Sequence, residues 1–87
     1  MEDEKSIPLD QLEIGRPARL ARLDLPPMES QRLMEMGLVA GTEVRILRRA
    51  PLKYPVLIQA RRSQLSLRKK IIRSIWVKPA DAEEAGP

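Results

Sequence analysis

Glycines and prolines divide residues 32–55 into short elements, and this punctuation constrains the fold more than any other feature of the chain. Apolar residues at helical spacing precede Gly37, which stands where a left-handed residue ends a helix. Gly41 predicts a tight turn, and the alternation of apolar and charged residues after it predicts a strand. A loop bracketed by Pro51 and Pro55 follows. This order is typical of a small barrel, and no residue in it has an evident catalytic role.

The rest of the chain predicts further short elements of the same kind. Strands are expected at residues 18–23, 42–49, 56–60, 64–67 and 73–77, and helical segments at 9–12, 28–36 and 68–72. The alternation breaks at Ala21 and Arg22, which predicts a bulge there, and Leu47 is expected to be half-buried. The strands before and after the proline loop are expected to pair antiparallel. We therefore expect a mainly β fold closed into a small barrel, which also protects the sheet edges.

A length of 87 residues corresponds to one domain with a small core. The folded unit is expected to span residues 7–78, with residues 1–6 and 79–87 as flexible tails because they hold few apolar side chains. The residues expected in the core are Leu33, Met36, Leu38, Val44, Ile46, Ile58, Leu65, Leu67, Ile75 and Val77. Met28 and Met34 are expected to fill gaps beside it.

The chain contains neither histidine nor cysteine. The ligands that soft and borderline transition metals prefer are therefore missing, and the carboxylates that remain are scattered along the sequence. The same absence removes the usual general base and the usual activated thiol. We therefore expect no enzyme, no catalytic residue, no cofactor and no metal site.

Charge is distributed unevenly along the chain. The sequence holds 16 Lys and Arg against 12 Asp and Glu, a net charge of +4, yet no acidic residue occurs from Val44 to Ala80. The simplest interpretation is a solvated basic surface. The functional interpretations are an acidic protein partner, an anionic membrane surface or nucleic acid. Nucleic acid is disfavoured, because only Tyr54 and Trp76 could stack on bases.

The N-terminus is acidic and is followed by no apolar run, which argues against a secretory signal. No apolar stretch approaches the roughly 20 residues that span a bilayer. The absence of cysteine fits a reducing compartment. We therefore expect a cytoplasmic protein.

Taken together, the glycines, prolines and core positions resemble the FeoA family. The matching residues are Arg32, Leu33, Met36, Gly37, Leu38, Gly41, Thr42 and Val44, then Ala50-Pro51, Pro55-Val56, Leu67-Arg68, Ile75 and Val77. The resemblance extends over about residues 7–77. It implies a small SH3-like β-barrel with one short helix inserted after the first strand. The same module is found at the C-terminus of iron-dependent repressors of the DtxR type.

The resemblance also implies a role. FeoA proteins are accessories of bacterial ferrous iron transport, so the expected partner is the cytosolic GTPase region of the membrane transporter FeoB, which would recruit the protein to the inner face of the membrane. Ferrous iron would associate only weakly or indirectly. An alternative is a stand-alone regulatory or nucleic-acid-binding module similar to the repressor domain. Weak self-association is also compatible with the sequence.

Two departures from the family pattern direct the choice of candidate site residues. Leu52-Lys53-Tyr54 fills the proline loop, where the family usually carries a Gly and an acidic residue, and Lys69-Lys70 stands where it often has Glu-Ala. Both departures make this chain more basic, so we expect partner choice to depend on them. The candidate partner-binding residues are Arg48, Arg49, Lys53, Tyr54, Arg68 and Lys69. Arg68 could instead cap carbonyls of the barrel, and Tyr54 could simply be packed.

Overall fold

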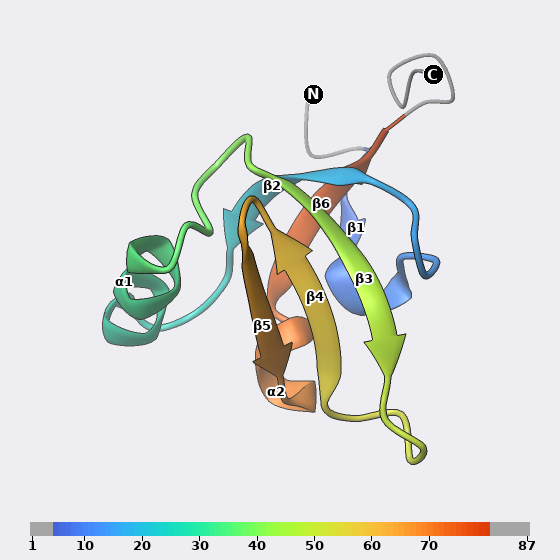
Figure 1. Cartoon of the computed structure of the whole chain (residues 1–87). Coiled ribbons are helices and arrows are strands. Elements are labelled where there is room, and N and C mark those ends of the chain that lie inside the picture. Colours follow the sequence, from blue (N-terminus) through green and yellow to red (C-terminus); the bar gives the residue numbers. More distant parts are fainter. Residues whose placement is uncertain (1–4, 81–87) are drawn as a thin grey trace.

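A six-stranded antiparallel sheet forms the body of the molecule in a computed structural model that describes residues 5–80 (Figure 1). Its strands are β1 (Ile7–Pro8), β2 (Ala18–Leu23), β3 (Glu43–Arg49), β4 (Val56–Ala60), β5 (Ser63–Leu67) and β6 (Ile75–Pro79). They are ordered β1-β6-β2-β3-β4-β5. In Figure 1 the β3–β5 strands lie in front of β1, β2 and β6, so the sheet bends around a central core. The expected mainly β barrel is confirmed.

The core is built from alternate residues of the strands together with apolar residues of the helical segments. Its buried members are Leu9, Leu12, Ala18, Leu20, Leu33, Leu38, Val44, Ile46, Val56, Ile58, Ala60, Leu67, Ile72, Ile75 and Val77. In β4 the pattern is strict: Val56, Ile58 and Ala60 are buried, whereas the residues between them are half-buried. Burial of this apolar surface is the main term that offsets the entropy of ordering the chain.

Two register shifts bend the sheet. One lies in β2 between Leu20 and Arg22, opposite β6, and confirms the expected bulge. The other lies in β3 between Ile46 and Arg48, opposite β4, and leaves Leu47 half-buried as expected. Bulges of this kind increase strand twist, which helps a small sheet to close.

The N-terminal edge differs from the prediction in one respect. Ile7 and Pro8 form a short strand, β1, that pairs with β6, with Ile7 opposite Val77. A 3-10 turn, η2 (Leu9–Gln11), follows and buries Leu9 against the core. The helix α1 (Pro27–Glu35) therefore follows the second strand of the chain, since a strand of two residues leaves no alternation for the sequence to reveal.

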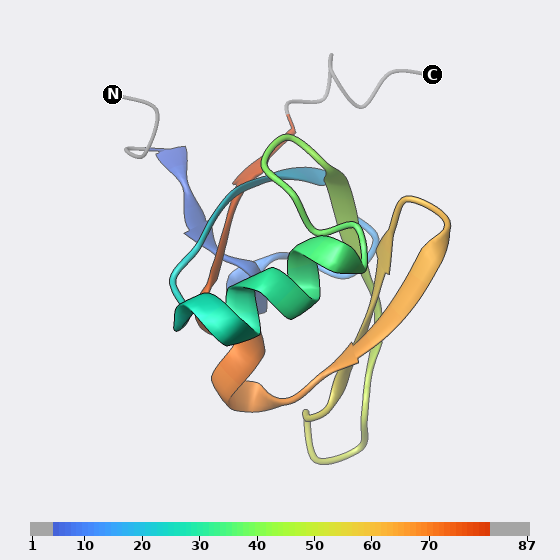
Figure 2. The ribbon, with the colours of Figure 1, turned by 90° about the vertical axis from the view of Figure 1, so that its left-hand side faces the viewer.

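Helix α1 lies across the open side between the two halves of the sheet (Figure 2). Pro27 occupies its first turn, where a missing N–H costs nothing. At its other end, Gly37 at φ +102° donates from N–H to the Met34 carbonyl at 3.0 Å, and Leu38 donates to the Leu33 carbonyl at 2.9 Å. This paired bonding is a Schellman motif, and it places Leu38 in the core as the sequence predicts.

The methionines of this region lie on the surface, contrary to expectation. Met28 is 72% exposed, Met34 45% and Met36 44%, and Leu33 is the residue that α1 buries. The reason is that α1 lies outside the barrel and touches the core along a narrow line.

Leu65 is half-buried and packs against the core. The second helix, α2 (Lys69–Ile72), buries Ile72 and matches the expected helical turn.

Candidate partner-binding site

The loop that joins β3 to β4 is a tight turn with a defined backbone. The Lys53 N–H donates to the Ala50 carbonyl at 2.7 Å, and the Ala50 N–H donates to the Pro55 carbonyl at 3.1 Å. Lys53 lies at φ +84°, and the Tyr54–Pro55 peptide bond is cis. The left-handed conformation of Lys53 is one that glycine adopts without strain, so the residue here departs from what the backbone favours.

Asp10 holds the base of this loop against η2. The Arg49 guanidinium donates to the Asp10 carboxylate at 2.8 Å and also to the Asp10 backbone carbonyl. The Tyr54 hydroxyl donates to the second carboxylate oxygen of Asp10. The two charged side chains are largely withdrawn from water, with 20% of Arg49 and 11% of Asp10 exposed. Charge-assisted hydrogen bonds of this kind are about twice as strong as neutral ones.

The hydrogen bonds of this cluster shift the pKa values of Asp10 and Tyr54 in opposite directions. Burial alone would raise the pKa of Asp10, but the hydrogen bonds from Tyr54 and Arg49 outweigh it and lower that pKa below its ordinary value. The hydrogen bond to Asp10 raises the pKa of Tyr54. At neutral pH the carboxylate is therefore charged and the phenol protonated, which is the combination that the hydrogen bonds require.

Two lysines flank the ring of Tyr54. The Lys53 ammonium lies 5.7 Å from the ring centroid and the Lys69 ammonium 5.8 Å from it. Both distances fall within the range of a cation–π contact. The β3–β4 loop and the start of α2 are thereby brought together, although their cations lie far apart in the sequence.

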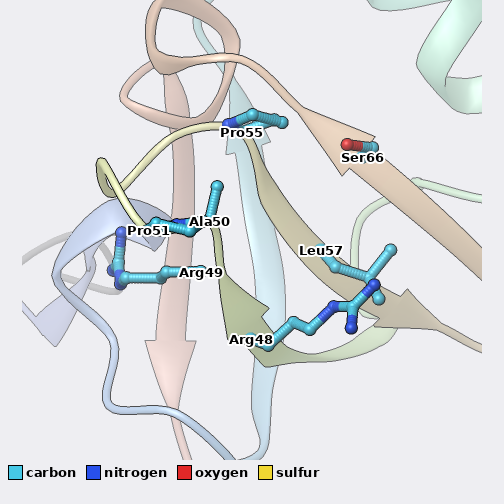
Figure 3. Close-up of a pocket in the computed structure, with 7 residues that line it drawn as sticks. All are labelled: Arg48, Arg49, Ala50, Pro51, Pro55, Leu57 and Ser66. Atoms are coloured by element: carbon cyan, nitrogen blue, oxygen red, sulfur yellow. The ribbon is translucent and has the colours of Figure 1, made fainter.

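Two cavities adjoin this loop and share Pro55 and Ser66 in their walls. The first, of about 530 Å³, is lined by Arg48, Arg49, Ala50, Pro51, Pro55, Leu57 and Ser66. In Figure 3 the Arg48 side chain lies beside Leu57, and Arg49 and Pro51 lie on the opposite side. The second, of about 430 Å³, opens between α1 and α2 and is lined by Glu29, Arg32, Leu33, Met36, Pro55, Ser66, Leu67, Arg68 and Ile71. Both cavities thus combine cations with apolar side chains, and the second also contains the carboxylate of Glu29.

The six candidate residues occupy this region in three different ways. Arg48 and Arg68 are exposed, and each lines one of the two cavities. Lys53 and Lys69 are exposed beside Tyr54. Arg49 and Tyr54 are hydrogen-bonded to Asp10, so the side chains most clearly available to a partner are the first four.

Sequence reasoning missed Asp10 and Met36 as parts of this region. Asp10 lies 39 residues before Arg49, and nothing near it in the sequence marks it as the partner of a loop arginine. Met36 was expected in the core, yet it lines the second cavity. The position of Met36 just after an amphipathic helix could have indicated this, because a methionine there can face a groove beside the helix.

The described residues 5–80 hold no group of three or more acidic side chains that could bind a metal ion. Within the same residues, no helix has the length and apolar character to cross a membrane.

Trp76 is half-buried on β6, and the Arg22 guanidinium lies 4.6 Å from its ring centroid.

The six-stranded antiparallel sheet with its short helix defines a small SH3-like domain. Residues 7–79 match the FeoA domain, which covers most of the chain. The chain belongs to the FeoA family, and the resemblance seen in the sequence is confirmed.

Solved structures of family members are similar throughout the fold. FeoA from Chlorobium tepidum is 30% identical with a TM-score of 0.83, over 93% of this chain and 77% of the other. FeoA from Stenotrophomonas maltophilia, a prokaryotic SH3 domain protein crystallised with zinc, is 29% identical with a TM-score of 0.69, over 87% and 91%. Iron(II) transport protein A from Clostridium thermocellum is 32% identical with a TM-score of 0.79 over 85% of this chain. The alignment spans 46% of that longer protein.

A manganese-dependent transcriptional repressor shares the fold at 18% identity, with a TM-score of 0.76 over 86% of this chain and 37% of the repressor. This likeness concerns the barrel architecture alone. It shows that the same scaffold serves proteins of different kinds, so function has to be argued from the surface that the scaffold carries.

Proposed function

We propose that this protein is an accessory of ferrous iron transport that binds the cytosolic GTPase region of a FeoB-type transporter. Two findings support the proposal. The chain belongs to the FeoA family, and a relative from S. maltophilia has been put forward as an activating factor of ferrous iron transport. The observation that carries it is the pair of adjoining cavities, which present arginines beside apolar side chains on one face.

The chemistry of this face specifies the kind of segment that would bind it. Arg48 and Arg68 stand in separate cavities on either side of the shared wall formed by Pro55 and Ser66. A partner segment with two acidic residues could pair with both arginines while it places an apolar side chain over the wall. Arginine suits this task because its planar fork binds a carboxylate through two hydrogen bonds.

The second cavity offers an adaptable apolar contact. Met36 is 44% exposed and lines that cavity with Ile71, which is half-buried. A flexible thioether side chain can adjust to the shape of a partner. Binding of this kind needs no catalytic group, and the basic surface would speed encounter with an acidic partner more than it would raise affinity.

The Asp10 cluster has a supporting role in this proposal. Arg49 and Tyr54 hold the loop in place, and Ala50 and Pro51 of this loop line the first cavity together with Arg49. They position the binding face and need not touch the partner. Arg48 and Arg68 would make the direct contacts.

The test is a titration of the full chain with the purified cytosolic domain of the transporter in lipid-free buffer at low salt. Arg48→Gln and Arg68→Gln are each expected to weaken binding about tenfold, as for a central arginine of an interface. Arg62→Gln is the matched control, because it removes the same charge from the β4–β5 turn at the far end of β4.

Absence of binding at low salt would overturn the proposal. Equal weakening by Arg48→Gln and by the control would also overturn the assignment of the face, since it would show that net charge alone drives binding. A parallel titration with duplex DNA addresses the repressor-like alternative. Steeply salt-dependent DNA binding, with none to the transporter domain, would favour that alternative.

A further inference from the structure

The tip of the β3–β4 loop projects away from the body of the barrel. Figures 1 and 2 both show it extending beyond the strands, at the end opposite to the one where the chain enters and leaves the fold. Leu52 occupies the tip and is 91% exposed, the largest exposure among the large apolar residues of residues 5–80. Its neighbours Pro51 and Lys53 are exposed as well. A leucine in this position covers no apolar surface of its own chain.

The tip is held in place by the loop's own hydrogen bonds and by Asp10. The Lys53 N–H closes the turn on the Ala50 carbonyl, and Asp10 fixes the residues on either side through Arg49 and Tyr54. The exposed leucine is therefore presented on a braced support. Because the tip is already ordered, little conformational entropy is lost when it enters another phase.

Cations lie at the base of this tip. Lys53 and Lys69 flank the ring of Tyr54, and the exposed Arg73 lies near enough to act electrostatically on the Tyr54 hydroxyl. No Asp or Glu occurs between Val44 and Ala80 in the sequence. Asp10 is already paired with Arg49, and Glu29 lies in the wall of the second cavity with Arg32 and Arg68. The loop itself and the helix α2 carry no carboxylate, so the charge next to the leucine is positive.

We infer that this end of the molecule binds an anionic lipid surface directly, with Leu52 inserted at the level of the headgroups and the lysines on the lipid phosphates. The argument rests on shape as well as charge. A protruding apolar tip ringed by cations cannot enclose a partner side chain, whereas it can enter the boundary between headgroups and acyl chains. Cations near such a surface each add attraction of the order of fivefold in affinity.

This inference does not depend on the proposed contact with the transporter. The cavities that hold Arg48 and Arg68 lie beside the loop, and the tip contributes Leu52 to neither of them. A protein bound to the cytosolic part of a membrane transporter could contact the transporter through the cavities and the lipid through the loop tip at the same time. The direct lipid contact would then confine the search for the transporter to the plane of the membrane.

The experiment uses the full chain and two kinds of vesicle, one of phosphatidylcholine alone and one in which phosphatidylglycerol replaces a third of it. The sequence contains no cysteine, so the Leu52→Cys variant takes an environment-sensitive fluorophore at the tip alone. Met28→Cys is the matched control, since Met28 is an exposed apolar residue on α1, away from the loop. The expected result is a blue shift for the tip label with anionic vesicles and none for the control label.

Affinity measurements in the unlabelled protein give the second readout. Leu52→Ser is expected to weaken binding to anionic vesicles about tenfold, because it removes the apolar insertion. Lys69→Gln is expected to weaken it about fivefold, and Arg62→Gln, at the opposite end of β4, much less. The thermal midpoint of each variant shows whether it is folded.

Three outcomes would overturn the inference. One is the absence of binding to anionic vesicles at low salt. Another is binding that depends on lipid charge but leaves the tip label unshifted, which would mean adsorption without insertion. The third is equal weakening by Lys69→Gln and Arg62→Gln. Each of these can occur while the transporter domain still binds in lipid-free buffer, so failure here is distinguishable from failure of the proposed function.

Discussion

The turn after α1 and the loop after β3 both reverse the chain, but different interactions hold them. Between Gly37 and Thr42 the chain is held mainly by hydrogen bonds to the backbone. The Thr42 hydroxyl donates to the Gly37 carbonyl at 3.1 Å, the Thr42 N–H donates to the Val39 carbonyl at 3.0 Å, and the Gly41 N–H donates to the Leu20 carbonyl of the neighbouring strand at 2.8 Å. The β3–β4 loop instead depends on Asp10, which is remote in the sequence. The first region is scaffold held mainly by backbone hydrogen bonds, whereas the second is braced by a largely buried ion pair.

Removal of the Asp10 carboxylate should cause the largest loss of stability among the variants considered for these two regions. Asp10→Ala leaves the Arg49 guanidinium largely buried without its ion pair, and we expect a loss of about 3 kcal/mol in the free energy of unfolding. Urea denaturation followed by circular dichroism measures it. Glu43→Ala is the matched control, because it breaks the 2.8 Å ion pair between Glu43 and Arg45. The side chain of Arg45 is 41% exposed and that of Glu43 51%, so the loss should be less than about 1 kcal/mol. Equal losses in the two variants would contradict the assignment of Asp10 as a brace.

The scaffold region could be predicted from the sequence because its signals are local. Gly37 and Gly41 both adopt positive φ, at +102° and +87°, as expected from their places after a helix and in a turn. The strand 56–60 was predicted with its observed bounds, because apolar residues alternate strictly along it. In each case the residues that determine the conformation lie within a few positions of one another.

The candidate site could be predicted only as a set of cations. The sequence pointed to the proline loop and to the residues after Leu67, and the structure brings these together around Tyr54. It could not show that Asp10 pairs with Arg49 or that Met36 lines a cavity, because both facts depend on how the sheet bends. Long-range polar contacts leave no periodic trace in a single sequence.

The Asp10 cluster should also make stability depend on pH at both extremes. The lowered pKa of Asp10 means that its stabilising contribution is complete above about pH 4, the ordinary pKa of the carboxyl, and is lost as the pH falls through the lowered value. The raised pKa of Tyr54 means that its contribution is complete below about pH 10 and is lost as the pH rises through the raised value. The effect should be smaller than that of Asp10→Ala, since the side chains remain in place.

Thermal midpoints measured from acid to alkaline pH test this dependence. Tyr54→Phe keeps the ring but removes the hydroxyl, so it should flatten the alkaline decline relative to the natural chain and leave an acid decline from the Arg49 pair. Asp10→Asn should reduce both declines. An alkaline decline that persists unchanged in Tyr54→Phe would mean that another group causes it.

The smallest effects on stability are expected at one residue of positive φ in each region, Gly37 and Lys53, and the two effects should have opposite signs. A Cβ added at Gly37 would meet no atom within 4 Å, so Gly37→Ala tests the backbone alone and should cost about 1 kcal/mol. Lys53→Gly relieves strain at φ +84° and should stabilise the fold by less than about 1 kcal/mol, because glycine also gains freedom in the unfolded chain. Urea denaturation of both variants decides the matter, with Lys70→Gly in α2 as a control that should destabilise. A loss on Lys53→Gly would show that the contact of its ammonium with the Tyr54 ring outweighs the strain, so that the loop is held by the lysine as well as by Asp10.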